Sequence, residues 1–310
     1  MSGTKEIKNR IKNILDTRKI TNAMYLIAST KMRKAKNKLD ETRPYFDSLK
    51  AEIKRIFRTV KDLDNKYFFP VNSTEAKDGT YGIVVITADK GLAGAYNINV
   101  IKETLRLLKD HEDSKLFIIG EYGRQYFKRQ GITVQEDFEF TGQEPTLEEA
   151  RLITTYLLDK YNSKEIDKIF VVYTDIGKRL DLEVISTRLL PFHREIVFNS
   201  KEEKVVENAF EFMPSIEAVL DHVIESYISG FVFGALVDSF CSEQSARIDA
   251  TRSANSNSDE LLQDLYVEYN RVRQTAITQE ITEISAGAKS QKLKKKEAKK
   301  YVWYRWNNSD

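Results

Sequence analysis

The stretch PSIEAVLDHVIESYISGFVFGALV (214–237) and its continuation LQDLYVEYNRVRQTA (262–276) decide the fold of this chain. No Gly or Pro occurs between Ala235 and Ala286, and Pro214 and Gly287 stand where a helix is expected to begin and to end. Apolar residues recur at helical spacing, and in the second part their steps alternate three and four, as in a heptad seam. These positions are Leu220, Val223, Tyr227, Phe231, Gly234, Leu262, Leu265, Tyr269, Val272 and Ala276. The sequence therefore predicts one helix over 214–288, on the order of 110 Å long, whose apolar face needs a second long helix or a partner.

A second long helix is predicted at the N-terminal end, over residues 1–60. Residues 4–43 contain neither Gly nor Pro, and Pro44 is expected to kink the helix rather than end it, because the helical pattern resumes after it. One apolar stripe is formed by Ile7, Ile11 and Ile14. A second is formed by Ile20, Met24 and Ile27, followed by Ala28, Met32, Ala35 and Leu39. Two long helices at opposite ends of the chain predict an antiparallel two-helix coiled coil, with the middle of the chain inserted at one end.

The middle of the chain has a different period. Residues 61–80 are polar and contain Pro70 and Gly79, so they are interpreted as a linker. Over 81–213, strands are predicted at 81–87, 115–120, 132–136, 166–173, 182–190 and 195–198. Helices are predicted at 97–110, at 121–130, and from a capping box of Thr146 and Glu149 to about 161. This alternation predicts an α/β domain with a mainly parallel sheet.

Charge and composition limit the classes of partner. The net charge of +2 does not favour nucleic acid. The stretch from Arg18 to Lys38 contains seven Lys or Arg and no acid, which is either a solvated face or a contact for an acidic partner surface. We expect no apolar run long enough to cross a bilayer and no signal or transit leader. Cys241 is the only cysteine, so no intrachain disulfide is expected.

No catalytic or metal-binding set is predicted. TADKGLAGAYN (87–97) follows the first strand and leads into a helix, where phosphate loops occur, but it lacks GK[ST] and G-x-G-x-x-G. His111, His193 and His222 are scattered without metal-site spacing. DIGKRLD (175–181) lacks the terminal Glu of a calcium loop. We expect no cofactor, no metal and no enzymatic activity of the chain by itself.

Four segments resemble the γ subunit family of F-type ATP synthases, in the same order along the chain. They are KEIKNRIKNILDTRKITNAMYLIASTKMRKAK (5–36), TADKGLAGAYN (87–97), SEQSARIDATRSANSNSDEL (242–261) and YNRVRQTAITQEITEISAGA (269–288). The resemblance implies a central rotor shaft inside an α3β3 ring of α and β subunits, with catalysis on the β subunits. It also implies an α/β domain that docks on the ε subunit and the c-ring, and a peripheral place at the cytoplasmic face of the bacterial membrane.

The resemblance also implies residues that contact the ring or couple it to the shaft. They are Met24, Lys31, Arg33, Arg247, Arg273, Gln274, Thr278, Gln279 and Glu280. Without the resemblance, each is interpreted as an ordinary exposed helix residue.

The chain departs from the family pattern at two motifs and at its end. Ala88, Ala93 and Ala95 replace the usual Ser, Cys and Gly of the turn at 87–97, here called the central turn, and Thr251-Arg252 replaces a usual Met-Asp. Residues 289–310 form a lysine-rich, then aromatic tail. It is interpreted as a solvated tail, or as a contact for an acidic protein, a membrane interface or an additional partner.

Four functions remain in competition. The first is the shaft of an ATP synthase, and the second is the shaft of an F1-like motor whose output is not proton translocation. The third is a free coiled-coil scaffold with an α/β head. The fourth is a nucleotide-dependent enzyme.

Overall fold

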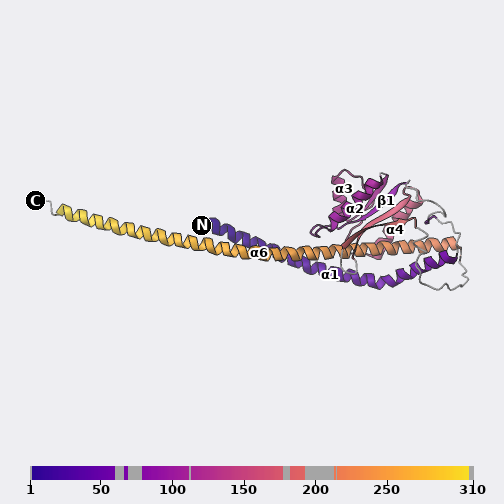
Figure 1. The fold of residues 1–310 in the computed structure, drawn as a ribbon, viewed down its shortest axis with the longest axis horizontal. Coiled ribbons are helices and arrows are strands. Elements are labelled where there is room, and N and C mark those ends of the chain that lie inside the picture. Colours follow the sequence, from indigo (N-terminus) through magenta and orange to yellow (C-terminus); the bar gives the residue numbers. More distant parts are fainter. Residues whose placement is uncertain are drawn as a thin grey trace. The chain divides into compact units, whose positions relative to one another are not determined.

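The computed structural model describes residues 2–59, 66–68, 79–111, 113–176, 182–192, 213 and 215–306 (Figure 1). The elements in chain order are α1 (Ser2–Thr59), β1 (Tyr81–Ile86), α2 (Tyr96–Asp110), β2 (Ser114–Ile119), α3 (Glu121–Arg129), α4 (Leu147–Asn162), β3 (Lys168–Ile176), β4 (Leu182–Leu190) and α6 (Ile216–Trp306). The chain divides into two compact units. The first is Met1–Ala23 with Arg252–Asp310, and the second is Met24–Thr251.

The first unit is an antiparallel pair of helical segments. Its core consists of Ile11, Leu262 and Leu265, with Ile7, Ile14, Leu15 and Tyr269 packed against it. Contacts run in opposite directions along the two segments: Arg18 pairs with Asp259 at 3.1 Å, and the Thr21 hydroxyl bonds to Asn255. Gly3, nearer the start of α1, lies beside Val272. The predicted heptad seam is confirmed as far as Val272.

α6 continues beyond the place where its partner segment begins. From Arg273 to Glu297 every α6 side chain is exposed, so the prediction that Ala276 belongs to the seam is wrong. The predicted helix end at Gly287 is also wrong, because α6 runs on to Trp306. A glycine inside a helix costs only about 1 kcal/mol relative to alanine, and the residues after Gly287 include several Lys, Leu and Ala, which are strong helix formers.

The second unit contains a four-stranded sheet of order β2-β1-β3-β4. β1 is parallel to both β2 and β3, whereas β4 is antiparallel to β3. Alternate residues of β1 enter two cores: Ile83 and Val85 pack with α2 and α3, while Val84 and Ile86 pack with α4, α1 and α6. Figure 1 shows α2 and α3 together on their side of the sheet. The predicted coiled coil with a mainly parallel α/β insert is confirmed.

α6 is fixed to the sheet by serines as well as by apolar side chains. The backbone N–H of Thr174 on β3 donates to the Ser239 hydroxyl at 3.2 Å, and the Ser242 hydroxyl donates to the Thr174 carbonyl at 3.2 Å. All three residues are buried. These bonds set the register of α6 on β3, which apolar contacts alone specify less sharply.

On its other side this part of α6 packs against α1, again in antiparallel order. The Cys241 thiol lies 3.9 Å from the Met32 carbonyl, and the Phe233 ring packs against Phe46 with their centroids 6.3 Å apart. Burial raises the pKa of the Cys241 thiol to about 12. The inward face of α1 includes Ala28 and Leu39 as predicted.

The second predicted apolar stripe of α1 is wrong at two positions. Ile20 and Ile27 are 62% and 56% exposed. The face that turns inward here carries Thr21, Tyr25 and Ala28, which are partly or fully buried. The isoleucines suggested the stripe by their hydrophobicity, but the 3.6-residue period assigns the inward positions to less apolar neighbours.

The smaller elements follow the prediction with one exception. Thr146 caps α4, accepting from the Glu149 backbone N–H at 3.1 Å. The predicted strand at 132–136 is reduced to a single bridge between Val134 and Leu116. The expected strand at 195–198, the helix start at 214 and His193 lie outside the described residues. Within the predicted linker, Tyr67 and Phe68 are buried in the core.

The expectation that no helix is apolar enough to cross a bilayer is wrong by length and composition. A window within residues 218–297 of α6 has a mean hydropathy of 1.3. However, 61% of that window is buried inside the structure, which is the pattern of a core helix.

Candidate functional site

A pocket of the second unit lies between α1, α6 and the turn that follows β1. Its volume is about 250 Å³. The lining residues are Met24, Ile27, Ala28, Lys31, Asp89, Lys90, Gly91, Leu92, Gln143, Phe240, Glu243, Gln244 and Arg247. Three of the predicted ring-contact residues, Met24, Lys31 and Arg247, are therefore brought to one place.

Arg247 fastens the central turn to α6. Its guanidinium pairs with Glu243 one turn earlier, and Nη2 donates to the carbonyls of Gly91 at 3.1 Å and Lys90 at 3.5 Å. Arg247 is only 9% exposed. Burial raises the pKa of the Glu243 carboxyl, and the ion pair with Arg247 opposes that shift. The structure thus places Arg247 as an internal clamp rather than on the open surface.

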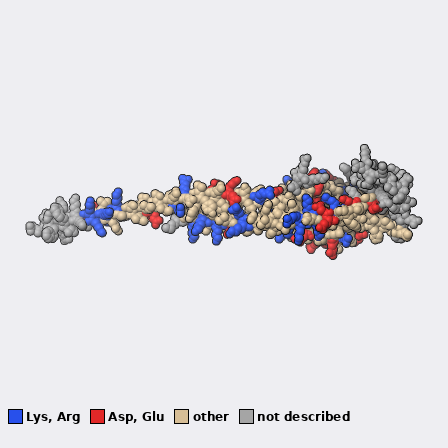
Figure 2. All heavy atoms as spheres, turned by 90° about the horizontal axis from the view of Figure 1, so that it is seen from below, with Lys and Arg blue, Asp and Glu red and all other residues tan. Residues whose placement is uncertain are grey.

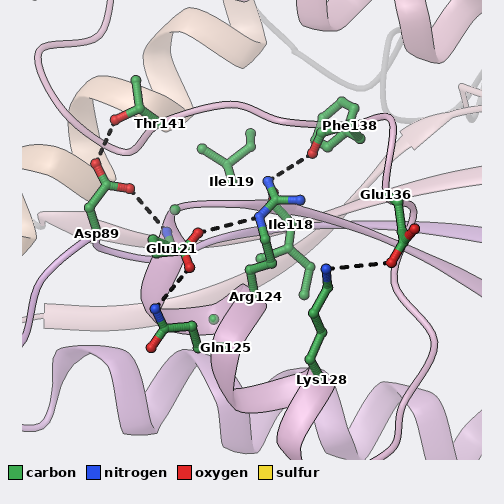
Figure 3. Close-up of polar contacts among 12 residues, drawn as sticks. Asp89, Ile118, Ile119, Glu121, Arg124, Gln125, Lys128, Glu136, Phe138 and Thr141 are labelled. Atoms are coloured by element: carbon green, nitrogen blue, oxygen red, sulfur yellow. Dashed lines mark hydrogen bonds and ion pairs between the residues drawn. The ribbon is translucent and has the colours of Figure 1, made fainter.

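Asp89 joins three loop segments around the same site (Figure 3). Its carboxylate accepts from the backbone N–H of Glu121 at 3.0 Å, from the N–H of Gly142 at 3.2 Å and from the Thr141 hydroxyl at 2.5 Å. Burial raises the pKa of this carboxyl, but the three hydrogen bonds outweigh burial and lower it. Asp89 therefore holds the central turn, the start of α3 and the loop before α4 together.

A buried arginine of α3, Arg124, binds backbone carbonyls next to this site. Arg124 is 8% exposed, and its Nη2 donates to the carbonyls of Phe138 at 2.9 Å and Ile118 at 3.2 Å (Figure 3). Its Nε lies 3.7 Å from the Glu121 carboxylate. Lys128 and Glu136 form a further ion pair at 3.5 Å. The hydrogen bonds of Arg124 thus satisfy one carbonyl at the end of β2 and one in the loop that follows α3.

The alanines that depart from the family pattern form a small core of their own. Ala88 and Ala93 are buried with Tyr96 and with Ala246 of α6. The Ala88 N–H donates to the Asn97 side-chain oxygen at 2.9 Å. Small side chains thus let the turn approach α6 closely, and the third replacement, Ala95, stands just before α2.

The basic stretch of α1 is largely solvent-facing. Lys31 pairs with Glu144 at 3.2 Å, and the Lys38 amine donates to the Pro145 carbonyl at 3.3 Å. Arg33, Lys34 and Lys36 are exposed and form no ion pair with the residues that the structure describes. Of the predicted contact residues on α1, Arg33 is therefore free to meet a partner, whereas Lys31 is partly engaged.

The predicted contact residues near the end of the chain lie in the first unit, on α6. Gln274, Thr278 and Gln279 line one open groove along the helix, together with Arg271, Thr275 and Thr282. Arg273 and Glu280 are exposed and, by helical period, occupy the opposite face. Ile277, Ile281 and Ile284 are also exposed. Both faces of this segment are available to a surrounding partner.

A family model described as ATP synthase matches residues 3–290. The chain is 40% identical over 289 residues to an ATP synthase gamma chain of Ruminiclostridium cellulolyticum, covering 92% of this chain and 97% of the relative. This chain belongs to the ATP synthase γ chain family. A second γ chain, from Acetivibrio thermocellus, is 37% identical over 94% of this chain and 100% of its own length.

Solved structures share the fold of this γ-family chain. A chain of the Euglena gracilis mitochondrial ATP synthase, in a structure titled OSCP/F1/c-ring, matches with a TM-score of 0.62 at 15% identity, over 94% of this chain and 95% of that one. A Tetrahymena thermophila chain from a central stalk and c-ring structure matches with a TM-score of 0.54 at 22% identity, over 76% and 99%. At these identities the likeness concerns the fold alone.

Two charged groups at the site of this γ-family chain hold loops in place. Arg247 and Asp89 each bind backbone atoms of loops, and the charge of Arg247 is paired with that of Glu243. Among the described residues, no group of three or more His, Cys, Asp or Glu is placed to hold a metal. His111 stacks on the Tyr81 ring with centroids 3.8 Å apart.

Sequence reasoning missed Asp89, Glu243 and Thr141. The i, i+4 spacing of Glu243 and Arg247 was a usable signal, because a charge pair at that spacing on a helix can form an ion pair. Asp89 follows a buried strand, where a short acid can cap a neighbouring helix. Its partners lie 32 and 53 residues away, at Glu121 and Gly142, and no local pattern indicates them.

Proposed function

We propose that this γ-family chain is the central rotor shaft of an F1-type ATP synthase. In this role it couples ATP synthesis or hydrolysis on an α3β3 ring to rotation and proton translocation. The observation that carries the proposal is family membership over nearly the whole chain, together with a long α6 segment whose side chains stay exposed. Such a segment is suited to a partner that surrounds it.

The proposed shaft is a non-catalytic subunit. Its partners are the α and β subunits of the ring, the ε subunit and the c-ring, and it lies at the cytoplasmic face of the bacterial membrane. We propose Met24, Lys31, Arg33, Arg273, Gln274, Thr278, Gln279 and Glu280 as its ring-contact residues, with Arg247 acting beneath that surface. The α/β domain is proposed to carry the contacts to ε and the c-ring.

The geometry suggests how torque would be passed inside the second unit. Arg247 and the Ser239 and Ser242 hydroxyls bind α6 to the central turn and to β3. Lys31 binds α1 to the loop before α4 through Glu144. A rotor needs such connections, because torque would not reach the α/β domain if the helices could slide against it. The exposed lysines and arginines of the shaft would make contacts with the ring that solvent and ions screen. Such contacts would not hold the shaft at one rotational angle.

The test is native mass spectrometry of the assembly purified through an affinity tag inserted in an exposed loop of this chain. We expect one copy of the chain with an α3β3 ring, and with proton-channel and c-ring subunits when the membrane is extracted gently. A ring with other companions and no proton channel would replace the proton-translocating output by another mechanical load. Purification of the chain without any ring would contradict the shaft proposal.

A further inference from the structure

We propose that residues 291–306, here called the C-terminal extension, form a helix that docks onto an acidic segment of another protein subunit. The family model ends at residue 290, and the Acetivibrio thermocellus γ chain is covered over its whole length by 94% of this chain. The C-terminal extension is therefore additional to the part of the chain that family membership explains. Its recognition chemistry must be read from its own residues.

The C-terminal extension is strongly basic along its first part. It contains six lysines and one arginine, and its only acid is Glu297. α6 continues through it as one helix to Trp306. Residues 291–297 are all exposed, and their lysines form no ion pair among the described residues. Figure 2 shows blue side chains gathered on this part of α6. These charges have no counterpart in the part of the chain that the structure describes.

Five of the six lysines fall on one face of the helix by their spacing in the sequence. Lys292, Lys295, Lys296, Lys299 and Lys300 follow the spacing i, i+3, i+4, i+7, i+8. In a core helix this spacing forms the apolar stripe. Here lysines occupy those positions instead. They form a continuous basic ridge, in contrast to lysines spread over all sides of a helix, which serve mainly to keep it soluble. A ridge of one sign fits a surface of the opposite sign.

An anionic membrane is a poorer fit than a protein. A helix that lies in a membrane interface carries an apolar face along its length, opposite its basic face. The positions opposite the lysine ridge include Lys294 and Glu297, so charged residues interrupt the apolar face that a membrane helix needs. The aromatic residues Tyr301, Trp303, Tyr304 and Trp306 instead follow the lysines at the end of the helix. Trp, Tyr and Arg are the residues that most often anchor protein interfaces.

The order of residues along the helix therefore gives the contact two parts. The lysine ridge would align the helix on carboxylates of the partner, and the aromatic end would enter an apolar pocket next to them. Such a contact should weaken with salt, because the ridge is exposed to solvent. It is independent of whether the motor drives protons.

The test uses site-specific photo-crosslinking in the whole assembly, in cells. A photoreactive amino acid replaces Leu293, which is 60% exposed on the C-terminal extension, and in the control it replaces Leu152, which is 59% exposed on α4. The attached peptide is identified by mass spectrometry. We expect residue 293 to join one defined peptide rich in Asp and Glu, and we expect the control position not to join it.

Charge variants decide whether the ridge causes the contact. K292E/K295E/K299E should lower the cross-link yield at least fivefold, whereas the matched K292R/K295R/K299R should retain it. A chain ending at Ser290 should still purify with the ring, which separates this proposal from the shaft proposal. Cross-links to lipid or nucleic acid, the absence of any cross-link at residue 293, or equal yields from the two triple variants would overturn it.

Discussion

Gly230 of α6 lies directly beneath the ring of Phe46 of α1. A methyl group placed on Gly230 would overlap ring atoms of Phe46, whereas one placed on Gly234, a single turn later, would meet nothing within 4 Å. Phe46 in turn packs against Phe233. The absence of a side chain at Gly230 is what lets the two helices approach each other at this level.

We expect Gly230→Ala to lower the free energy of unfolding by about 1–3 kcal/mol, because the overlap forces Phe46 out of its packed position. Gly234→Ala is the matched control, and it should be neutral or stabilising by up to about 1 kcal/mol through helix propensity. Urea denaturation of the two variants measures the difference. Equal effects of the two substitutions would mean that the helices do not cross closely at Gly230.

Arg247→Ala should destabilise the chain by about 3 kcal/mol, because it leaves the buried Glu243 carboxylate without its partner and frees the carbonyls of the central turn. The double variant E243M/R247M should lose less than Arg247→Ala alone. Arg273→Ala, at an exposed position of the same helix, should change stability by no more than about 0.5 kcal/mol. Denaturant midpoints compare the variants, and an Arg247→Ala chain as stable as the Arg273→Ala control would refute the internal clamp.

The sequence predicted the large elements because each has a local signature. Helical spacing of apolar residues, in stretches that lack Gly and Pro, indicated the two terminal helices, and the change to buried apolar runs indicated the strands of the α/β domain. The errors arose where distant residues decide. Arg247 carries the same charge as the exposed Arg273, but besides Glu243 it binds the carbonyls of Lys90 and Gly91, more than 150 positions earlier. Gly287 carried a stop signal that its helix-forming neighbours overrule.

Asp89→Asn should destabilise the chain by about 1–2 kcal/mol at neutral pH, because hydrogen bonds to a charged acceptor are stronger than those to an amide. The pKa of Asp89 is lowered in the folded state, so its stabilisation is present above the usual value of 3.8 and is lost as the pH falls through the folded pKa. Wild type and Asp89→Asn should therefore converge in strongly acidic solution. Exposed Asp159→Asn serves as the control in urea denaturation across pH, and a constant gap down to low pH would contradict this account.

Asp238 makes the stability of the chain depend on pH in the opposite direction to Asp89. Burial and the neighbouring Asp175 raise the pKa of Asp238 to about 6, against a smaller effect of Arg43. Because the folded pKa is raised, the contribution to stability is present below 3.8 and is lost as the pH rises through about 6. Asp238→Asn should therefore be more stable than wild type at pH 8, by up to about 2 kcal/mol.

Asp175→Asn tests the cause of that shift. Removing the charge of Asp175 should bring the pKa of Asp238 toward its ordinary value and flatten the change in stability between pH 4 and pH 7. Thermal unfolding at a series of pH values measures both variants. An Asp238→Asn chain less stable than wild type at pH 8 would reverse the sign argued here.

The exposed basic residues of α1 give a prediction about assembly. K34E/K36E should weaken binding of the chain to the proposed ring at least tenfold at low salt, and the deficit should shrink at high salt. K102E/K109E changes the same number of charges on α2 and should leave ring binding intact. Dissociation of the purified assembly, followed by gel filtration at increasing salt, measures both. Equal behaviour of the two variants would exclude this face of α1 from the ring contact.

The buried position of Cys241 makes the chain convenient for labelling. Thiol reagents react with the thiolate, and a thiol with a pKa of about 12 that is 3% exposed remains protonated and shielded at the pH of ordinary labelling reactions. A cysteine introduced at an exposed position such as Leu92 or Leu293 would therefore take up a fluorophore or a bead linker while the native thiol stays intact. Rotation could then be followed from either position without first replacing a core residue between α1 and α6.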